Sequence, residues 1–512
     1  MPIYKKYKVE RASSTLIATN LKSISFCQDS NLKDICLFEN YLIFLQLRHP
    51  RFGNERFGNQ RFENQGFENS CFDMRFYNRE KEIARLNEIR ERSVRNAQFT
   101  VVTGRRRIGK TQLVLRVNND TPILYFFVAR KAESFLCQDF QQEITNKLGV
   151  PILGEINSFG KLFEYLMQLS QERAFTLILD EFQEFIKVAP GVYSEIQHYW
   201  DIYSQHSKIN IIVCGSVYSL MYKIFENEKE PLFGRATAKL SVRPFEIDVL
   251  KEILADHNAN YTPEDLLALF TFTGGVAKYV QQLMDSDATT CKRMLNFIIQ
   301  EDSTFLNEGK NMLIDEFGGE YSTYFTILSA IARGENTRAK IEALVKREIG
   351  GYLTKLEQDY GLITKKLPIF SKVETKNVRY SIEDNFLIFW FRFIYKYGYI
   401  LEVGNYDGLR SIIDRDYKTY SGKILEKYFH TKIIQSQNIT KIGGYWNRKG
   451  ENEIDLVVVN ELNKEAQIIE IKRNNDNIDL DALKNKGAQM IRATGEMKDY
   501  QISYLGLSLE DC

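Results

Sequence analysis

The stretch QFTVVTGRRRIGKTQLVL, residues 98–115, runs from an apolar, β-prone segment through a loop into a helical segment. A strand that passes so directly into a helix is typical of a parallel sheet. The loop has the spacing G-x-x-x-x-G-K-T, in which Gly104 and Gly109 let backbone N–H groups wrap an anion at the helix N-terminus. Lys110 is then expected to reach the β- and γ-phosphates of a nucleoside triphosphate and Thr111 to ligate Mg²⁺. The alternative, a basic turn without a ligand, is disfavoured by the flanking strand and helix.

A second apolar segment supports a nucleotide site. Residues 175–179 have the pattern of a buried strand, and they end in Asp180 and Glu181. Acidic side chains at the carboxyl edge of a parallel sheet lie beside such a phosphate-binding loop. We therefore expect Asp180 to hold the Mg²⁺ shell and Glu181 to polarise the attacking water. Without the loop, the two acids would be an ordinary exposed strand end.

Three more strands are expected in PILYFFVA, INIIVCGS and AKLSVRPF, separated by helical segments. This alternation predicts an α/β fold with a parallel sheet. Ser216 follows the strand at 209–214, where a polar side chain can sense the γ-phosphate or, equally well, cap the next helix. Arg235 is a candidate arginine finger, acting on this nucleotide or on a neighbour's, with a surface ion pair as the alternative.

Composition limits the other classes of protein. At 512 residues the chain is expected to form several domains. Its 68 Lys and Arg against 67 Asp and Glu give no overall charge that indicates a nucleic-acid partner, so such a surface would be a local patch. Seven scattered cysteines without a Cys-x-x-Cys pair, and five histidines, argue against disulfides and structural zinc. Without an apolar run of about 18 residues or a secretory signal, we expect a cytoplasmic protein with no membrane contact.

The first part of the chain differs in character. Residues 51–70 form a five-residue repeat, RFGNE, RFGNQ, RFENQ and GFENS. One phenylalanine in every five residues matches neither the helical nor the strand period, and the composition offers little for a core. Met74 begins MRFYNREKEIARLNEI, which has the pattern of a domain start. We expect residues 1–73 to be a disordered leader or a translated upstream segment, with Met74 as the natural start.

In chain order, FYNREKEIARL, GRRRIGKTQLV, LILDEFQEF, VCGSVYSLM, LFGRATAKLSVRPF and FTGGVAKYV resemble the archaeal-type AAA ATPase family, relatives of the STAND signalling ATPases. The resemblance covers the chain beyond the leader, and the ordered set is more specific than the phosphate loop alone. It implies ATP as the ligand, with Asn78 and Arg79 near the adenine and with Gly274 and Gly275 at the start of a helical lid. Such families usually carry proline two residues after the second glycine, where this chain has Ala277, which bears on the rigidity of the lid.

The segment at 316–400 has the pattern of a winged helix-turn-helix. It contains three short amphipathic helices, with Asn336 or Thr337 as a cap, and GLITKKLPIFSKVETKNVRYSI then alternates like a two-stranded wing. The third helix, expected at about residues 351–360, carries Lys355 together with Glu357 and Asp359. A protein contact or a spacer role is therefore as well supported as DNA binding. We interpret the aromatic run DNFLIFWFRFIYKYGYI as core rather than as a base-stacking platform.

The stretch ENEIDLVVVNELNKEAQIIEIKR is the second chemical signal in the chain. Strands at 453–460 and 465–473 flank a four-residue turn, and a symmetric hairpin on that turn places Asp455 opposite Glu470, with Lys472 on the same face. The apolar residues next to them point the other way, into a core. Two carboxylates beside a lysine can bind Mg²⁺ or Mn²⁺ and position a water for phosphodiester cleavage. A solvated edge hairpin with a salt bridge is the alternative.

This arrangement resembles the PD-(D/E)xK nuclease superfamily, with Glu426 on the preceding helix and Gln489 on the following one. The resemblance implies a metal site of Glu426, Asp455 and Glu470, and catalytic roles for Asp455, Glu470 and Lys472. Archaeal-type ATPases often end in such a domain, so the two resemblances support each other. Basic residues that are candidates to hold a phosphate backbone stand nearby: Arg448, Lys449, Lys472, Arg473, Lys484 and Lys486.

Together these patterns predict an α/β protein with a P-loop ATPase domain at 74–245, a helical lid at 246–315, a winged helix at 316–400 and a restriction-endonuclease-like α/β domain at 401–512. The expected function is Mg²⁺-dependent ATP hydrolysis whose nucleotide state gates a C-terminal domain that acts on nucleic acid. Two alternatives stay open. One is a regulatory switch that binds a protein partner or forms a homo-oligomer, with an inactive C-terminal scaffold; the other is a DNA-binding regulator that uses the winged helix.

Overall fold

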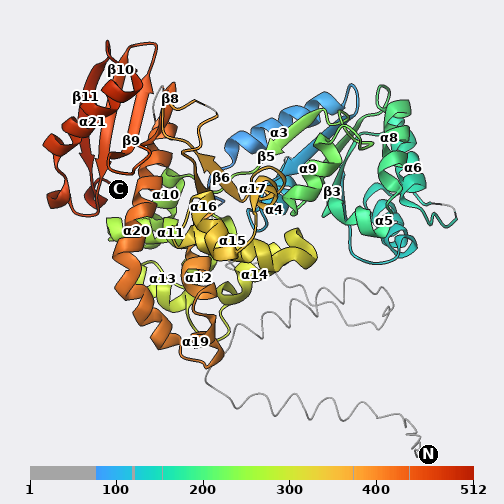
Figure 1. Ribbon diagram of the computed structural model, residues 1–512. Helices are drawn as coiled ribbons and strands as arrows, with labels where there is room; N and C mark the ends of the chain where they lie inside the picture. Colours follow the sequence, from blue (N-terminus) through green and yellow to red (C-terminus); the bar gives the residue numbers. More distant parts are fainter. Residues whose placement is uncertain (1–75, 118–120, 153, 373, 437–438) are drawn as a thin grey trace, which may run out of the picture. The chain divides into compact units, whose positions relative to one another are not determined.

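The computed structural model describes residues 76–512 except 118–120, 153, 373 and 437–438 (Figure 1). The expectation for the repeat-rich leader lies outside these residues. The residues from Phe76 to Cys512 form one compact unit. Within this described part, every helix is too short or too polar to cross a membrane.

Five parallel strands form the first sheet, in the spatial order β2-β3-β4-β1-β5. Their bounds are β1 (Gln98–Thr103), β2 (Ile123–Phe127), β3 (Phe175–Asp180), β4 (Ile209–Cys214) and β5 (Ala238–Ser241). The three central strands are buried along nearly their whole length, because helices cover both faces of a parallel sheet. The parallel sheet and the strands expected from the sequence are confirmed.

Alternate residues of these strands face two layers of helices. Val101 and Leu177 belong to the core on one face, and Val102 and Ile178 to the core on the other, as the period of two in a strand requires. The first layer contains α5 (Glu133–Leu148), α6 (Phe159–Glu172), α8 (Val192–Tyr203) and α9 (Tyr218–Glu226), and the second contains α3 (Glu80–Ser93) and α4 (Lys110–Leu115). Figure 1 shows α5, α6 and α8 grouped together beside the sheet.

Five helices follow the sheet: α10 (Ile247–His257), α11 (Pro263–Thr273), α12 (Ala277–Asp285), α13 (Cys291–Ile298) and α14 (Thr304–Phe317). At the start of α11, the side chains of Thr262 and Asp265 each accept a bond from the other's backbone N–H, and Pro263 takes the first helical position. Residues 265–273 of this helix are buried, since helices from the lid and from later in the chain pack around it. A helix that is apolar all round is expected to be enclosed in this way.

The described residues between 321 and 382 form three α-helices followed by a two-stranded antiparallel sheet, the order of elements expected for this segment. These are α15 (Tyr321–Ala332), α16 (Arg338–Val345), α17 (Gly350–Thr354), β6 (Ile363–Lys366) and β7 (Arg379–Ile382). The third helix is shorter than expected, because the backbone widens into a π-helical turn at Lys355–Asp359. The aromatic run forms α18 (Asn385–Phe389), a second π-helical segment (Trp390–Tyr395) and α19 (Gly398–Glu402). Its phenylalanine rings are buried, which confirms its role as core.

The long helix α20 (Tyr406–Ser436) leads into a second sheet, whose order is β11-β10-β9-β8. Its strands are β8 (Lys441–Trp446), β9 (Glu453–Asn460), β10 (Glu465–Ile471) and β11 (Gln501–Leu507), and α21 (Leu480–Thr494) crosses between the last two. β8, β9 and β10 are antiparallel, whereas β10 and β11 are parallel, as a helical crossover requires. The hairpin expected at β9 and β10 is therefore confirmed.

Candidate nucleotide site and a second polar cluster

The loop between β1 and α4 follows a path that requires glycine. Gly104 has a φ of +151°, and a Cβ added there would meet the carbonyl oxygen of Val242 at 2.7 Å. Gly109, directly before α4, has a φ of +93°. Any other residue would be strained at both positions. The two glycines thus shape the loop as the sequence predicts.

Lys110, the first residue of α4, is buried inside this loop. Its Nζ donates to the carbonyl oxygens of Gly104 and Arg105, at 2.9 and 3.1 Å. Burial lowers the pKa of the Lys110 ammonium, repulsion from Arg106 adds to the effect, and nearby acidic groups oppose it. A cation surrounded by backbone dipoles at a helix N-terminus is placed to meet the phosphates of a nucleotide.

Thr111 and Asp180 meet at the carboxyl edge of the sheet. Thr111 Oγ1 donates to Asp180 Oδ2 at 2.7 Å, and Tyr125 Oη on β2 donates to the same oxygen at 2.8 Å. A hydroxyl and a carboxylate beside a phosphate loop fit Mg²⁺, which takes one or two protein oxygens and completes its shell with phosphate and water. Thr111 and Asp180 would hold the ion, whose charge would offset that of the phosphates.

Glu181 follows in a left-handed backbone conformation, with a φ of 54°. This conformation costs free energy for a residue with a side chain, and such positions gather at functional sites. Glu181 Oε2 accepts bonds from Ser216 Oγ at 2.7 Å and from Gln183 Nε2. The N-cap of α9 is Val217, so the alternative role of Ser216 as that cap is wrong. The structure instead brings Ser216 to the carboxylate of Glu181.

A cavity of about 420 Å³ opens beside Glu181. Part of its wall is apolar and comes from α14 and from the segment between α17 and β6, through Met312, Leu313, Tyr360 and Leu362. The polar part of its wall comes from Glu316 on α14 and from residues around the carboxyl edge of the sheet: Arg105, Arg106, Arg130, Glu181, Glu184 and Ser216. The cavity therefore adjoins the phosphate loop on the side of Glu181.

Asn78 and Arg79 lie against the segment that follows β5. Both have left-handed backbones, with φ values of 55° and 92°, and the Arg79 N–H donates to Asn78 Oδ1 at 2.8 Å. The buried Arg79 guanidinium donates to the Arg243 carbonyl at 2.7 Å and lies over the Phe245 ring, 5.1 Å from its centre. The Phe245 N–H in turn donates to the carbonyl of Gly275 at 2.8 Å. The two distant segments expected near the adenine are thus brought together.

The glycine pair joins α11 to α12. Gly274 and Gly275 have φ values of +57° and +77°, and a Cβ on Gly275 would meet a backbone carbonyl oxygen at 2.5 Å. Position 275 therefore requires glycine, and Gly274 has a left-handed conformation that favours it. Ala277, at the place where related families carry proline, is the first residue of α12. The Lys278 N–H donates to the carbonyl of Arg107 at 3.2 Å, and this bond ties the start of the lid helix to the phosphate loop.

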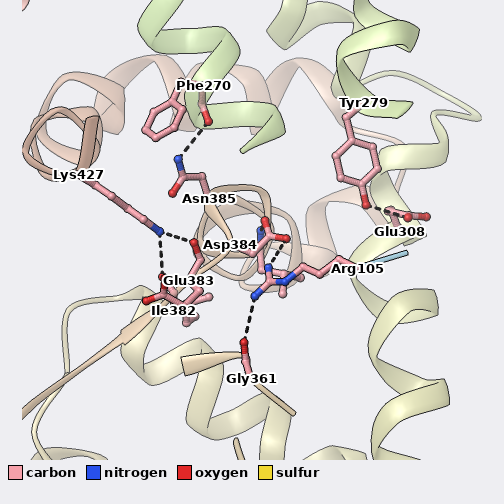
Figure 2. A network of polar contacts seen from close by, with 11 residues as sticks. Arg105, Phe270, Tyr279, Glu308, Gly361, Ile382, Glu383, Asp384, Asn385 and Lys427 are labelled. Atoms are coloured by element: carbon pink, nitrogen blue, oxygen red, sulfur yellow. Dashed lines mark hydrogen bonds and ion pairs between the residues drawn. The ribbon is translucent and has the colours of Figure 1, made fainter. Parts of the chain in front are cut away.

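Two arginines of the phosphate loop bind carboxylates from later parts of the chain. Arg105 Nη1 donates to Asp384 Oδ2 at 2.6 Å, and its Nη2 donates to the Gly361 carbonyl at 3.2 Å (Figure 2). Arg107 Nη2 lies 2.9 Å from Glu308 Oε2 on α14. Both carboxylates are only 3% exposed. Removing one partner of such a pair is costly, because it leaves a buried charge uncompensated.

Arg235 lies at the opposite edge of the sheet from the phosphate loop. It precedes β5, whose first residue, Ala238, pairs with Thr100 of β1, whereas the phosphate loop leaves the carboxyl end of β1. Its Nη2 donates to Asp201 Oδ2 at 3.1 Å near the protein surface. The expectation that Arg235 acts on the nucleotide of its own chain is therefore wrong, because parallel strands separate their two ends. A role toward a neighbouring chain stays a prediction.

Sequence reasoning missed four residues of this site: Tyr125, Gln183, Glu308 and Asp384. Tyr125 and Gln183 are close in sequence to the ends of expected strands. Each has a polar group next to an apolar strand, and this could have identified them because a buried polar group needs a hydrogen-bond partner. Glu308 and Asp384 lie far along the chain from the arginines that they bind. Only the fold identifies these two.

The hairpin of β9 and β10 carries the second polar cluster. Its register pairs Ile469 with Leu456, which is the register predicted for the hairpin, and the paired residues end there. The Ile471 N–H then donates to Asp455 Oδ2 at 2.8 Å. Lys472 Nζ lies 3.2 Å from Asp455 Oδ2 and 3.4 Å from Glu470 Oε1. The two carboxylates and the lysine therefore converge, and the ion pairs hold them together.

Glu426 on α20 lies close enough to this cluster to interact electrostatically with its charged groups. Burial, followed by repulsion from Asp455 and Glu453, raises the pKa of Glu426 to about 7. Gln489 on α21 is exposed, and Lys486 of that helix lies 3.5 Å from a carboxylate oxygen of the cluster.

The expected metal set of Glu426, Asp455 and Glu470 is not assembled as a metal site. Across the described residues, no group of three or more His, Cys, Asp or Glu side chains is arranged to hold an ion. The physical reason is visible at the hairpin, where the ammonium group of Lys472 bridges two of the three carboxylates. A metal role for these residues stays a prediction.

Comparison with known proteins gives two family matches. Residues 76–283 match a family described as an ATPase domain predominantly from Archaea. Residues 390–491 match a family described as archaeal and bacterial proteins of unknown function.

Individual relatives cover much of the chain. An uncharacterised protein of Methanocaldococcus jannaschii is 31% identical over 408 residues, which are 78% of this chain and 87% of that protein. Among solved structures, a Walker-type ATPase of Pyrococcus abyssi has 20% identity and a TM-score of 0.47, over 62% of this chain and 96% of its own. The ORC2 protein of Aeropyrum pernix has 15% identity and a TM-score of 0.43, over 62% of this chain and 94% of its own.

The ATPase match spans the whole parallel sheet and the first lid helices, so it contains the phosphate loop, the acidic strand end and the glycine pair. The Methanocaldococcus relative is matched over most of its length. This chain therefore belongs to the family of archaeal-type P-loop ATPases.

Proposed function

We propose that this protein hydrolyses ATP with Mg²⁺ at the carboxyl edge of its parallel sheet. The proposal rests on the different hydrogen-bond partners of two adjacent acids, Asp180 and Glu181. Asp180 Oδ2 accepts a hydrogen bond at 2.7 Å from the hydroxyl of Thr111, a candidate metal ligand. Glu181 Oε2 accepts one at 2.7 Å from the hydroxyl of Ser216, and Glu181 lines the cavity. This arrangement suits a site in which the first carboxylate serves the ion and the second serves the attacking water.

In the proposed reaction, a water oxygen forms a bond to the γ-phosphorus while the bond from that phosphorus to the β,γ-bridging oxygen breaks. ADP leaves with the bridging oxygen, and inorganic phosphate forms with the oxygen of the water. Glu181 takes the proton of the water and returns it to solvent. Lys110 offsets charge on the β- and γ-phosphates, and the bonds from Ser216 and Gln183 hold the Glu181 carboxylate in place.

Wild-type protein is expected to release phosphate from ATP in the presence of Mg²⁺ and to stop when EDTA removes the ion. The reason is that Thr111 is neutral and Asp180 is negatively charged, so the charge of the phosphates beside them is offset only when the metal ion is bound. A phosphate-release assay measures this, and restoring activity with excess Mg²⁺ is the control for damage by the chelator. No release with Mg²⁺, or equal release in EDTA, would contradict the proposal.

We also propose that the nucleotide state reaches the C-terminal region through residues 382–385, here called the junction. Figure 2 shows that hydrogen bonds with the phosphate loop, α11 and α20 converge on it. Arg105 of the phosphate loop bonds Asp384, and Asn385 Nδ2 donates to a carbonyl of α11 at 3.2 Å. Lys427 of α20 donates to two carbonyls of the junction, one of them at 3.3 Å. The phosphate loop, the lid and α20 thus share one set of partners.

The bonds at the junction leave little freedom for independent movement. Burial lowers the pKa of Lys427 to about 8, and the carbonyls of the junction are the partners that satisfy its ammonium. A buried polar group that loses its partner destabilises the protein. If Arg105 shifts when nucleotide binds, we therefore expect residues 382–385 and their partners on α11 and α20 to shift with it. Glu426, next to Lys427 on α20, is near the second polar cluster. This path supports gating of the C-terminal region.

A second candidate function is metal-dependent cleavage of nucleic acid by the C-terminal region. The favouring observation is that Asp455, Glu470 and Lys472 converge on strands whose other residues are mostly apolar and buried. Carboxylates in such a place are retained at a cost in stability, which is typical of functional sites. In the form described here Lys472 neutralises the two acids. We propose that the ATP-bound protein releases this lysine so that Mg²⁺ or Mn²⁺ can bind.

Nicking of plasmid DNA in Mg²⁺ or Mn²⁺ is expected to be abolished by Asp455→Ala and by Lys472→Ala, because each removes a member of the cluster. Lys464→Ala, an exposed lysine in the turn of the same hairpin, is the matched control and should cut like wild type. Cleavage that survives both cluster substitutions would contradict a nuclease role for these residues.

The same assay tests the gating. ATP should change the nicking rate of wild type, whereas Arg105→Ala should nick at a rate that does not respond to ATP, because its bond to Asp384 is gone. No cleavage under any condition, from protein that hydrolyses ATP, would favour the regulatory switch. Salt-sensitive DNA binding that is lost in Lys355→Ala would favour the DNA-binding regulator.

A further inference from the structure

Ser216, which binds the Glu181 carboxylate, lies on the short segment between β4 and α9. Its Oγ donates to Glu181 Oε2 at 2.7 Å. The helix that follows begins without a side-chain cap, because its N-cap residue is Val217. The first N–H groups of a helix have no partner within the helix, so their partners must come from elsewhere. The position of Ser216 therefore depends on what holds the start of α9.

Glu316 on α14 holds the start of α9. Its Oε1 accepts a hydrogen bond from the Tyr218 N–H at 3.1 Å, and its Oε2 accepts one from Ser219 Oγ at 2.7 Å. A carboxylate at this position also interacts favourably with the partial positive charge of a helix N-terminus. Burial raises the pKa of Glu316, and the bonds from Ser219 and Tyr218 oppose this effect. An acid retained where burial disfavours its charge is typical of functional positions.

The same helix also holds the phosphate loop. Glu308 Oε2 on α14 lies 2.9 Å from Arg107 Nη2, and Glu308 Oε1 accepts a bond from Tyr279 Oη at 2.9 Å. Glu308, Met312 and Glu316 are spaced by four residues, so they share one face of the helix. About 12 Å of helix separates the two acids, at about 1.5 Å per residue. Because Met312 and Glu316 line the cavity, α14 borders it while its acids bind the phosphate loop and the start of α9.

We propose that Glu316 is a positioning residue for ATP hydrolysis, which holds the start of α9 so that Ser216 keeps the Glu181 carboxylate in its catalytic orientation. The inference rests on the proposed hydrolysis and deepens it, because it makes the orientation of the base depend on a helix outside the sheet. Glu316 acts through its hydrogen bonds and exchanges no proton with the attacking water. Since α14 also binds Arg107, it connects the phosphate loop with the base.

The test measures single-turnover ATP hydrolysis by wild type and by Glu316→Ala. Loss of both bonds should let the start of α9 shift, and we expect the rate to fall roughly 10- to 100-fold, since a displacement of about 1 Å is enough for such a loss. The rise of Tm with Mg²⁺ and ATP should stay as in wild type, because Lys110 and Thr111 are unchanged. Glu301→Ala, which replaces an exposed acid shortly before α14, is the matched control and should hydrolyse ATP like wild type.

Two further comparisons separate positioning from general damage to the fold. Glu316→Gln should recover most of the rate, because its amide oxygen can accept the bond from Tyr218 and its amide N–H can donate to Ser219 Oγ. In a Ser216→Ala background, Glu316→Ala should have little further effect on the rate, because residues that act through one another are not additive. A residue that only stabilises the fold would lower the rate by the same factor in both backgrounds.

Several outcomes would overturn the inference. A wild-type rate in folded Glu316→Ala would remove Glu316 from the reaction, and a low rate in Glu181→Gln would at the same time leave the proposed hydrolysis intact. An equal effect of Glu316→Ala with and without Ser216, or a loss of the Tm rise together with the rate, would show damage to the fold. If Glu316→Ala does not fold, Ser219→Ala removes one of the two bonds, and a wild-type rate in that variant would overturn the inference. No turnover in wild type would overturn the proposed hydrolysis and this inference with it.

Discussion

Lys110→Ala is expected to gain no stability from ATP. In wild type the Lys110 ammonium is buried inside the phosphate loop, and its present partners are two backbone carbonyls that the phosphates of ATP would replace. A ligand at about 100 times its Kd stabilises the folded state by about 2.7 kcal/mol. Wild type should therefore show a clear rise in Tm with Mg²⁺ and ATP, and the variant should show none. Thermal unfolding with and without nucleotide measures the difference.

The control for this measurement is Lys161→Ala, an exposed lysine on α6, which should respond to ATP like wild type. Lys110→Ala also removes two hydrogen bonds inside the protein, so its Tm without nucleotide sets its own baseline. A full rise of Tm with ATP in Lys110→Ala would show that this lysine does not bind the phosphates.

Glu181→Gln should lower ATP turnover by roughly 10²- to 10⁴-fold while ATP binding is kept. The carboxamide oxygen can still accept the bond from Ser216, so the local geometry is preserved, but the amide cannot take a proton from the attacking water. Single-turnover hydrolysis measures the chemical step, and the rise of Tm with ATP measures binding. The two readouts separate a lost base from a lost site.

Glu172→Gln, an exposed acid at the end of α6, is the matched control and should leave both readouts unchanged. Turnover at the wild-type rate in Glu181→Gln would mean that another group activates the water. Loss of ATP binding would instead point to a structural role for Glu181, whose left-handed backbone at φ 54° makes it sensitive to substitution.

Local sequence patterns predicted the elements that depend on neighbours in the chain. The strand expected at 209–214 is β4 with the same bounds, and the hairpin expected at 453–460 and 465–473 has the predicted register. Strand period, turn length and the spacing of the phosphate loop are properties of short segments, so a short segment is enough to recognise them. The π-helical turns at 355–359 and 390–395 were missed, because nothing in the composition of these segments sets them apart from ordinary helix.

The residues of the candidate site also fall into two groups, those recognisable from a short segment of sequence and those placed by the packing of distant segments. The sequence by itself determined the residues whose roles depend on contiguous chain, which are Gly104, Gly109, Lys110 and Thr111 of the loop and the acids that end β3. In these segments the backbone path alone sets where each side chain points.

Only the tertiary structure decided how the arginines are used. The sequence singled out Arg235 as a candidate arginine finger and gave the three arginines of the phosphate loop no individual role. The fold pairs Arg105 and Arg107 with buried acids far along the chain and places Arg235 at the opposite edge of the sheet. Arg105 and Arg106 both line the cavity. The physical reason is that a charged side chain acts on whatever lies within a few ångströms of it, and that neighbourhood is created by the packing of distant segments.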